Sequence, residues 1–141
     1  MKVTFTTDQP TITAPYAGDA GYDLHAAEAV VLRPGERWRI SVGAHIELPP
    51  CTAGLIRDRS GLAHFHGLTV LGGVIDQGYR GLLSVVLLNT DERQSYEVNI
   101  GDRIAQLVIL PILTPALEVV EGTWEMSATV RAENGFMSTG V

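Results

Sequence analysis

The chain has 141 residues, of which 45% are hydrophobic, so it has room for one domain with a sizeable core. Its 16 acidic and 10 basic residues give a formal net charge of −6, which argues against a protein that coats nucleic acid, because such proteins need a broad basic surface. No apolar run approaches the roughly 18 to 20 residues that span a bilayer, and the first residues lack a signal-peptide core, so we expect a cytoplasmic protein without membrane contact.

Short apolar runs rich in β-branched residues recur along the chain, separated by Gly, Pro, Asp and Asn, which is typical of strands joined by turns. In chain order, the predicted strands are residues 3–5, 30–32, 37–42, 45–48, 54–57, 83–88, 96–100, 104–112 and 117–120. Many short strands with frequent turns favour a sandwich, jelly roll or barrel. The one predicted helix is Ser60–His66, which Ser60 can cap and Gly67 can end.

Five stretches place glycine beside charged or hydroxyl residues, where a plain strand would not. The first, residues 17–24 (AGDAGYDL), taken alone is a loop that leads into a strand. The second, residues 59–63 (RSGLA), places Arg59 and Ser60 at the start of the short helix. Free backbone N–H groups and the helix dipole favour an anion at that point, although simple N-capping explains Ser60 equally well.

The third stretch, residues 72–81 (GGVIDQGYRG), suits a hairpin whose backbone lies close to something flat. Asp76, beside apolar neighbours, is a costly carboxylate unless it has a partner or a role, although an ordinary turn also explains it. In the fourth, residues 101–108 (GDRIAQLV), the polar Gln106 needs partners within the protein or around a hydrated metal. The fifth, residues 131–140 (RAENGFMSTG), combines an arginine, an aromatic ring and two hydroxyls.

Together and in this order, the five stretches resemble the five sequence motifs of the trimeric dUTPase family, and the resemblance extends from Ala17 to Gly140. It implies an all-β, jelly-roll (β-clip type) domain over residues 1–130 with one short helix. It also implies a homotrimer, in which a flexible C-terminal arm of residues 131–141 completes a neighbouring active site. The implied reaction is Mg2+-dependent hydrolysis of dUTP to dUMP and pyrophosphate, which keeps uracil out of DNA and supplies dUMP for dTMP synthesis, with no nucleic-acid or membrane partner.

The resemblance also implies roles for individual residues. Asp76 is the catalytic residue that activates water for attack on the α-phosphorus, and Asp23 and Gln106 hold Mg2+ through water, with Gln106 also near the substrate. The residues implied to bind phosphate are Arg59, Ser60, Gly61, Arg131, Ser138 and Thr139. Those implied to bind uracil through a hairpin that leaves no space for the methyl group of thymine are Val70, Gly72, Gly73, Val74 and Ile75, with Phe136 stacked on the base. Tyr79 lies against the deoxyribose and excludes a ribose 2′-hydroxyl.

The sequence departs from the family pattern at Asp58, where the family usually has proline. This acid either lies near the phosphate-binding residues or pairs with Arg57. In the arm, three of the usual glycines are replaced, by Ala132, Asn134 and Met137. The related dCTP deaminases rely on a glutamate where this chain has Val86, so deamination is rejected. The alternative that we retain is a nucleotide-sensing regulatory protein with weak turnover.

Overall fold

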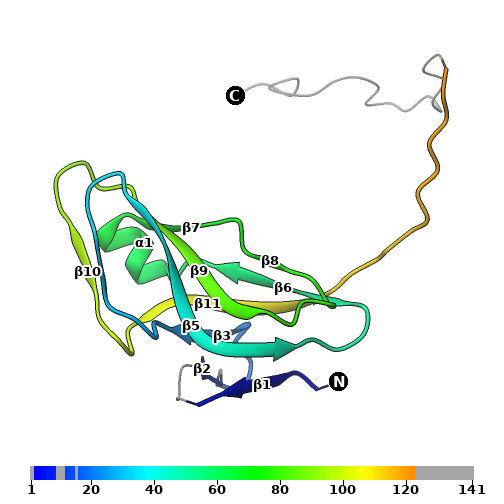
Figure 1. Cartoon of the computed structure of the whole chain (residues 1–141), viewed down its shortest axis with the longest axis horizontal. Helices are drawn as coiled ribbons and strands as arrows, with labels where there is room; N and C mark the ends of the chain where they lie inside the picture. Colours follow the sequence, from blue (N-terminus) through cyan, green and yellow to red (C-terminus); the bar gives the residue numbers. More distant parts are fainter. Residues whose placement is uncertain (1, 9–11, 15, 123–141) are drawn as a thin grey trace.

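A computed structural model describes residues 2–8, 12–14 and 16–122 of the chain (Figure 1). The predicted arm, residues 131–141, therefore lies outside the described residues. So do four of the residues to which a role is assigned, namely Arg131, Phe136, Ser138 and Thr139.

The described chain forms two main antiparallel sheets and a two-stranded ribbon (Figure 1). In spatial order, the four-stranded sheet contains β1 (Thr4–Thr7), β5 (Arg37–Glu47), β9 (Leu82–Asn89) and β7 (Leu68–Leu71). The five-stranded sheet contains β2 (Ile12–Thr13), β3 (Gly21–His25), β11 (Arg103–Pro111), β6 (Thr52–Arg57) and β8 (Val74–Ile75). The ribbon pairs β10 (Tyr96–Val98) with β4 (Val30–Leu32). The predicted mostly-β class is thus confirmed.

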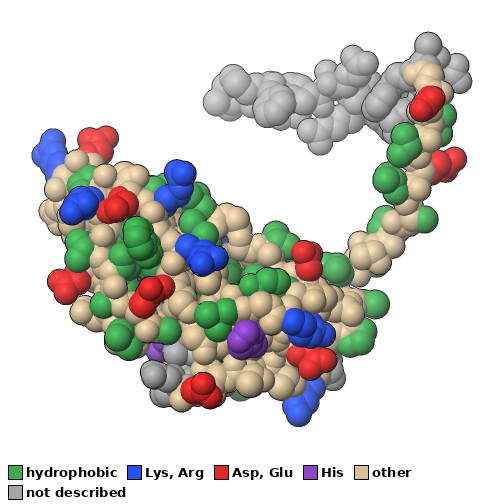
Figure 2. Space-filling model, in the orientation of Figure 1, with side chains coloured by type: hydrophobic (Ala, Val, Ile, Leu, Met, Phe, Trp, Pro, Cys, Tyr) green, Lys and Arg blue, Asp and Glu red, His purple; other side chains and the backbone are tan. Residues whose placement is uncertain are grey.

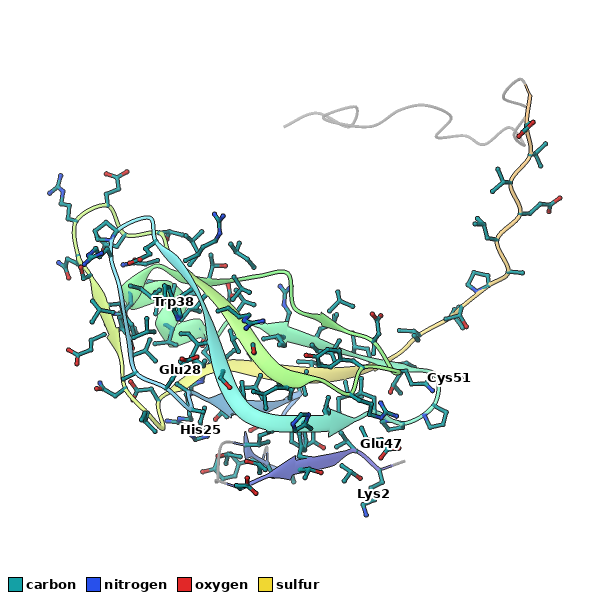
Figure 3. All side chains as sticks on the ribbon, viewed as in Figure 1. Lys2, His25, Glu28, Trp38, Glu47 and Cys51 are labelled. Carbon is teal, nitrogen blue, oxygen red and sulfur yellow. The ribbon has the colours of Figure 1, made fainter. Side chains whose placement is uncertain are left out.

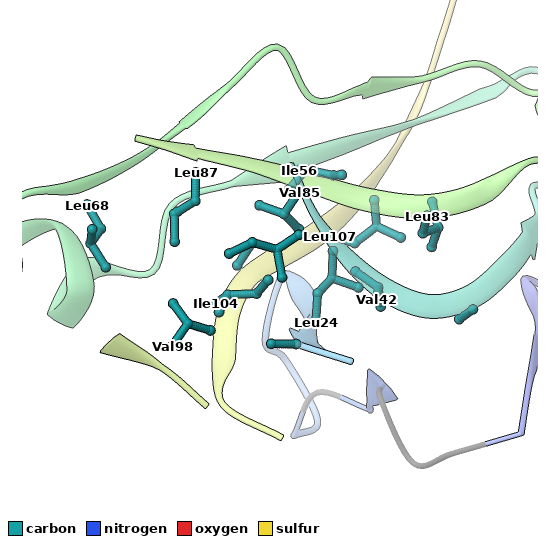
Figure 4. Packing of buried hydrophobic residues seen from close by; sticks show 14 of the residues in the cluster. Leu24, Val42, Ile56, Leu68, Leu83, Val85, Leu87, Val98, Ile104 and Leu107 are labelled. Atoms are coloured by element: carbon teal, nitrogen blue, oxygen red, sulfur yellow. The ribbon is translucent and has the colours of Figure 1, made fainter. Parts of the chain in front are cut away.

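One hydrophobic core lies between the sheets (Figure 4). Alternate residues of β9 are buried, as expected for a strand with one face on the core, and Leu83, Val85 and Leu87 form this buried face. The five-stranded sheet contributes Leu24 and Leu107, both fully buried, among others. Burial of these faces fixes the register of the strands that carry the polar residues discussed below.

Two predicted strands, residues 37–42 and 45–48, are a single strand, β5. The register with β9 shifts between Ser41 and His45, and Gly43 within this interval has φ 69°. Only glycine adopts this left-handed conformation readily, so Gly43 permits a bulge that bends the strand without ending it. The glycine that indicated a turn therefore marks an irregularity inside one strand.

The predicted helix is present as α1 (Ser60–His66). It ends as predicted at Gly67, whose φ of 62° is left-handed and whose N–H donates to the carbonyl of Ala63 at 3.2 Å. The predicted cap is wrong, because Arg59 occupies the N-cap position, no side chain caps the helix, and Ser60 is the first helical residue. No helix in the described part of the chain is long and apolar enough to cross a membrane.

The prediction of a strand at residues 117–120 is also wrong for the single chain, in which residues 112–122 have no regular secondary structure. This segment leaves the end of β11 and extends away from the two sheets (Figure 1). An apolar run forms a strand only when a neighbouring strand supplies hydrogen bonds, and among the described residues no strand pairs with this segment.

Candidate functional site

A cavity of about 580 Å3 opens beside the start of α1. Its walls come from the segment before β3, from β3 itself, from the first residues of α1 and from β11. The assigned residues that line it are Asp23, Arg59, Ser60, Gly61 and Gln106. Three of the five sequence stretches, far apart in the chain, therefore meet at one place.

The sheet order explains this meeting. β11 lies between β3 and β6, and Gln106 of β11 is in register with Asp23 of β3 on one side and Arg57 of β6 on the other. Residues directly opposite one another in an antiparallel pair project from the same face of the sheet. The chain continues from β6 through Arg59 into α1, which brings Ser60 and Gly61 to the same edge.

Asp23 is held by two arginines. Its Oδ1 atom lies 3.1 Å from Nε of Arg59, and its Oδ2 atom lies 3.4 Å from Nη1 of Arg103. Arg59 also donates from Nη1 to the carbonyl of Arg103 at 3.3 Å. Each guanidinium has five N–H donors, so both arginines keep donors for an anion after they pair with Asp23. The cavity can therefore bind phosphate, although it also contains carboxylates.

Arg103 was not assigned a role from the sequence. In a regular strand, residues three apart point to opposite faces, so Arg103 and Gln106 would not share a cavity. The register of β11 with β3 shifts between Arg103 and Ala105, and this irregularity brings both side chains into the cavity wall. A bulge of this kind has no clear sequence signal here, beyond the basic residue within the GDRIAQLV stretch.

Gln106 has the partner that its position required. Its Nε2 atom donates to the carbonyl of Asp58 at 2.8 Å, and its Oε1 atom accepts no hydrogen bond from another described residue. A Cβ atom on Gly21 would lie 3.0 Å from this Oε1 atom, so the glycine leaves space beside the amide oxygen. Of the two kinds of partner expected for Gln106, within the protein or around a hydrated metal, the structure shows the first.

The described residues contain no group of three or more His, Cys, Asp or Glu side chains that could hold a metal ion directly. The cavity instead offers two carboxylates, of Asp23 and Asp19, and the amide side chain of Gln106. Mg2+ keeps several of its waters and is commonly held by one or two carboxylates together with substrate phosphates. These residues therefore fit a hydrated Mg2+ that arrives with a phosphate ligand, and they do not fit a metal cage made only of protein.

The segment that joins β7 to β8, for which we keep the name hairpin, contains the two adjacent glycines. The predicted hairpin is wrong as to pairing, because β7 pairs with β9 and β8 pairs with β6 in the other sheet. Gly72 and Gly73 have φ of 71° and 96°, which a residue with a side chain adopts only at a cost. The carbonyl of Gly73 accepts from the N–H of Ile56 at 2.8 Å, and a Cβ atom at Gly73 would lie only 2.8 Å from the carbonyl oxygen of Ile56. The positive φ angles favour glycine at both positions, and the close approach to β6 requires glycine at Gly73 alone, since a Cβ atom at Gly72 would meet nothing within 4 Å.

Asp76 and Tyr79 do not line the cavity. β8 pairs with β6 at Ile75 and Gly54, so Asp76 follows at one end of β6, whereas Arg59 lies beyond the other end. At a rise of about 3.3 Å per residue, the length of β6 separates Asp76 from Arg59 by roughly 15 to 20 Å. Asp76 is exposed, and its carbonyl accepts from the N–H of Tyr79 at 3.0 Å in a turn.

The family model for dUTPase matches residues 7–140 of the chain. The chain is 42% identical over 141 residues to a deoxyuridine 5′-triphosphate nucleotidohydrolase of Cutibacterium acnes, with 94% of this chain and 91% of the relative covered. It is 48% identical over 128 residues to the enzyme of the same name from Clostridium novyi, with 89% and 87% covered.

Solved structures are also similar. The dUTPase of Staphylococcus bacteriophage 80alpha with dUpNHpp has a TM-score of 0.87 and 32% identity over 99% of both chains, and it is described as controlling the transfer of virulence genes. A mutant dUTPase of phage phi11 of S. aureus, which coordinates a structural Mg(II) ion, has a TM-score of 0.78 and 30% identity over 89% of this chain and 100% of that chain.

Proposed function

The chain belongs to the dUTPase family and hydrolyses dUTP to dUMP and pyrophosphate, and we propose that its active site is shared between copies of the chain in a homotrimer. One observation carries this proposal. The cavity collects Asp23, Arg59 and Gln106, whereas Asp76 and Tyr79 lie at the far end of β6 in the same chain. A second copy that places its Asp76 loop beside this cavity would complete the site.

The segment after β11 supports an assembly. Side chains of Leu113, Leu117, Val119 and Val120 are 95%, 87%, 75% and 81% exposed. They project from the extended segment, with no cover from the two sheets (Figure 2). Large apolar side chains exposed together on one segment favour an interaction site, and a second copy of the chain is the occupant that a homotrimer provides. The arm of residues 131–141 would then continue from this segment to a neighbouring site.

In the proposed mechanism, Asp76 takes a proton from a water molecule whose oxygen bonds to the α-phosphorus. The bond from the α-phosphorus to the bridging oxygen breaks, and pyrophosphate leaves with the electron pair. Arg59, Ser60 and Gly61 bind phosphate oxygens and orient the triphosphate. Asp23 and Gln106 would hold a hydrated Mg2+, which would supply positive charge to neutralise the phosphates.

Substrate choice is assigned to the hairpin, to Tyr79 and to the arm. The hairpin residues proposed to read uracil through their backbone groups are Val70, Gly72, Gly73, Val74 and Ile75. The hydroxyl of Tyr79 donates to the carbonyl of Leu82 at 2.8 Å, and a Cβ atom at Gly81 would lie 2.6 Å from Cζ of the ring. A ring packed this closely against Gly81 can exclude the 2′-hydroxyl of a ribose by steric contact. The arm residues proposed to bind phosphate are Arg131, Ser138 and Thr139, with Phe136 stacked on uracil.

A second candidate function is regulation by the nucleotide-bound form, with weak turnover. The observation in its favour is the similarity to the 80alpha dUTPase, which is described as acting by a proto-oncogenic G protein-like mechanism. We place either activity in the cytoplasm.

The test is a pyrophosphate-release assay with dUTP, dCTP, dTTP and UTP, each with and without Mg2+, together with native mass spectrometry. Rapid Mg2+-dependent release from dUTP alone by a trimer supports the enzyme with a shared site. Tight dUTP binding with negligible release supports the regulator, and a fully active monomer contradicts the shared site.

A further inference from the structure

Asp58 connects two parts of the molecule that the proposed function uses separately. Its Oδ1 atom accepts a hydrogen bond from the backbone N–H of Val70 at 2.6 Å, and its Oδ2 atom accepts from the hydroxyl of Thr69 at 2.9 Å. Its own carbonyl accepts from Nε2 of Gln106 at 2.8 Å. The expected alternative, a pair with Arg57, is not found, because the ion pairs among the described residues do not include Asp58.

The bond to Val70 lies where the chain crosses between the sheets. β7 belongs to the four-stranded sheet, in which Val70 is in register with Leu87. The chain then turns and joins the five-stranded sheet as β8, where Gly73 accepts from the N–H of Ile56. The start of the hairpin has no strand partner in the five-stranded sheet among these pairings, and the carboxylate of Asp58 takes the place of one.

The carboxylate of Asp58 also links the two ends of the segment that contains α1. The chain leaves β6 of the five-stranded sheet after Arg57, forms α1 and enters β7 of the four-stranded sheet at Leu68. The two hydrogen bonds of Asp58 therefore set the distance between the start of the hairpin and the adjacent residues Arg59 and Ser60. Asp58 is half-buried, so water competes only in part for these acceptor positions.

We propose that Asp58 is a positioning residue that holds the uracil-reading hairpin in the conformation that rejects a 5-methyl group. This inference rests on the proposed function, because it requires that the hairpin binds the base. Without the carboxylate, the N–H of Val70 and the hydroxyl of Thr69 form hydrogen bonds with water, and the hairpin is free to move outward. A looser hairpin admits the methyl group of dTTP, while Asp76 and the cavity residues keep their side chains.

The experiment compares kcat and KM for dUTP and dTTP in the wild type, Asp58→Ala, Asp58→Asn and Thr69→Val. Loss of both bonds in Asp58→Ala should lower the dUTP-to-dTTP ratio of kcat/KM by roughly tenfold, through KM more than through kcat. Thr69→Val keeps the bond to Val70 and should lower the ratio by about threefold. Asp58→Asn retains an amide oxygen for the Val70 N–H and should recover most of the selectivity.

Gly73→Ala distinguishes a failure of the inference about Asp58 from a failure of the proposed role of the hairpin. This substitution disturbs the hairpin directly, because Gly73 has a φ of 96°. If Gly73→Ala changes the ratio and folded Asp58→Ala does not, the inference is overturned while the hairpin keeps its role. If neither variant changes the ratio, the hairpin does not read the base, and the proposed function of the hairpin fails with the inference. If Asp58→Ala does not fold, an unchanged ratio in Thr69→Val overturns the inference.

Discussion

The side-chain Oε1 atom of Gln77 accepts a hydrogen bond from the backbone N–H of Cys51 at 2.8 Å. Cys51 lies in the turn between β5 and β6 (Figure 3), with a left-handed φ of 58° that is uncommon outside glycine. On the other side, Nη1 of Arg80 donates to the carbonyls of Gln77 and Tyr79 at 2.9 and 2.8 Å. The loop that carries the exposed Asp76 is thus held from both sides by its neighbours.

Because Gln77 and Arg80 fix this loop, Asp76→Asn should change its chemistry and not its shape. An amide cannot accept the proton of water, so we expect kcat for dUTP to fall by at least roughly 100-fold. Binding of dUpNHpp, measured by calorimetry, should be largely unchanged. Asp19→Asn is the matched control, because Asp19 lines the cavity but its carboxylate accepts from the N–H of Tyr16. Residual activity of Asp76→Asn within about tenfold of the wild type would remove Asp76 from the mechanism.

Tyr79 offers a test of sugar selection. In Tyr79→Ala the space beside Gly81 opens, so the ratio of kcat/KM for dUTP over UTP should fall, because rejection depends on a repulsive contact. Tyr79→Phe keeps the ring and loses only the bond to the carbonyl of Leu82, so it should retain most of the discrimination. The assignment is refuted by an unchanged ratio in the alanine variant.

Asp23→Asn should weaken the apparent affinity of the enzyme for Mg2+. The substitution removes the charge that faces Arg59 and Arg103 and weakens the hold on the waters of the ion. We expect a higher Mg2+ concentration for half-maximal activity and at least roughly tenfold lower kcat/KM at low Mg2+. An activity curve against Mg2+ that overlays the wild-type curve would exclude Asp23 from the metal site.

Asp91 gives the fold a dependence on pH that is separate from catalysis. Its carboxylate accepts from the N–H groups of Arg93 and Gln94 at 2.7 and 2.8 Å, and these bonds hold the pKa of the Asp91 carboxyl below its usual value. A depressed folded-state pKa stabilises the fold above the unfolded value of about 3.8, and this contribution is lost as pH falls through the folded-state pKa. Asp91→Asn should lower Tm at pH 7. The fall in Tm on acidification should then be smaller for this variant than for the wild type. Equal losses in thermal denaturation would contradict this.

The elements that the sequence predicts well are those with an unbroken pattern. The apolar run of residues 83–88 and the helix ended by Gly67 depend on local chemistry, and both are found in the structure. β8 is only two residues long, and β3 (Gly21–His25) mixes glycine and charge with its apolar residues. Their pairing with β6 and β11 makes them strands, and such long-range partners leave little trace in a local pattern.

The same distinction applies to the site. Gln106 could be selected because it is polar within an apolar strand, whereas Asp23 could be selected only through the resemblance of its stretch to the family motif. The sheet order places the two residues opposite one another. Arg103 could not be selected, since it reaches the cavity through an irregularity in β11. Nor did the sequence indicate that the carboxylate of Asp58 would bind the backbone of Val70, because that contact depends on how two sheets meet.

The separation of Asp76 from Arg59 within one chain leads to a mixing experiment. Arg59→Gln and Asp76→Asn should each be nearly inactive as pure trimers, because every site lacks either a phosphate-binding arginine or the base. If a site takes Arg59 from one copy and Asp76 from another, mixed trimers contain sites in which both residues are intact. Random assembly from equal amounts of the two chains gives this combination in roughly a quarter of the sites.

We therefore expect the co-refolded mixture to regain about a quarter of the wild-type activity per site. Arg93→Gln, a change in an exposed turn of the described chain, replaces Arg59→Gln in the control mixture. There, the Asp76 of the Arg93→Gln copies is intact, so half of the sites should be active, whichever copy supplies Arg59. Were both residues to serve a site within one chain, the first mixture would stay inactive because neither chain has both. Mixed trimers identified by native mass spectrometry but still inactive would contradict the shared site.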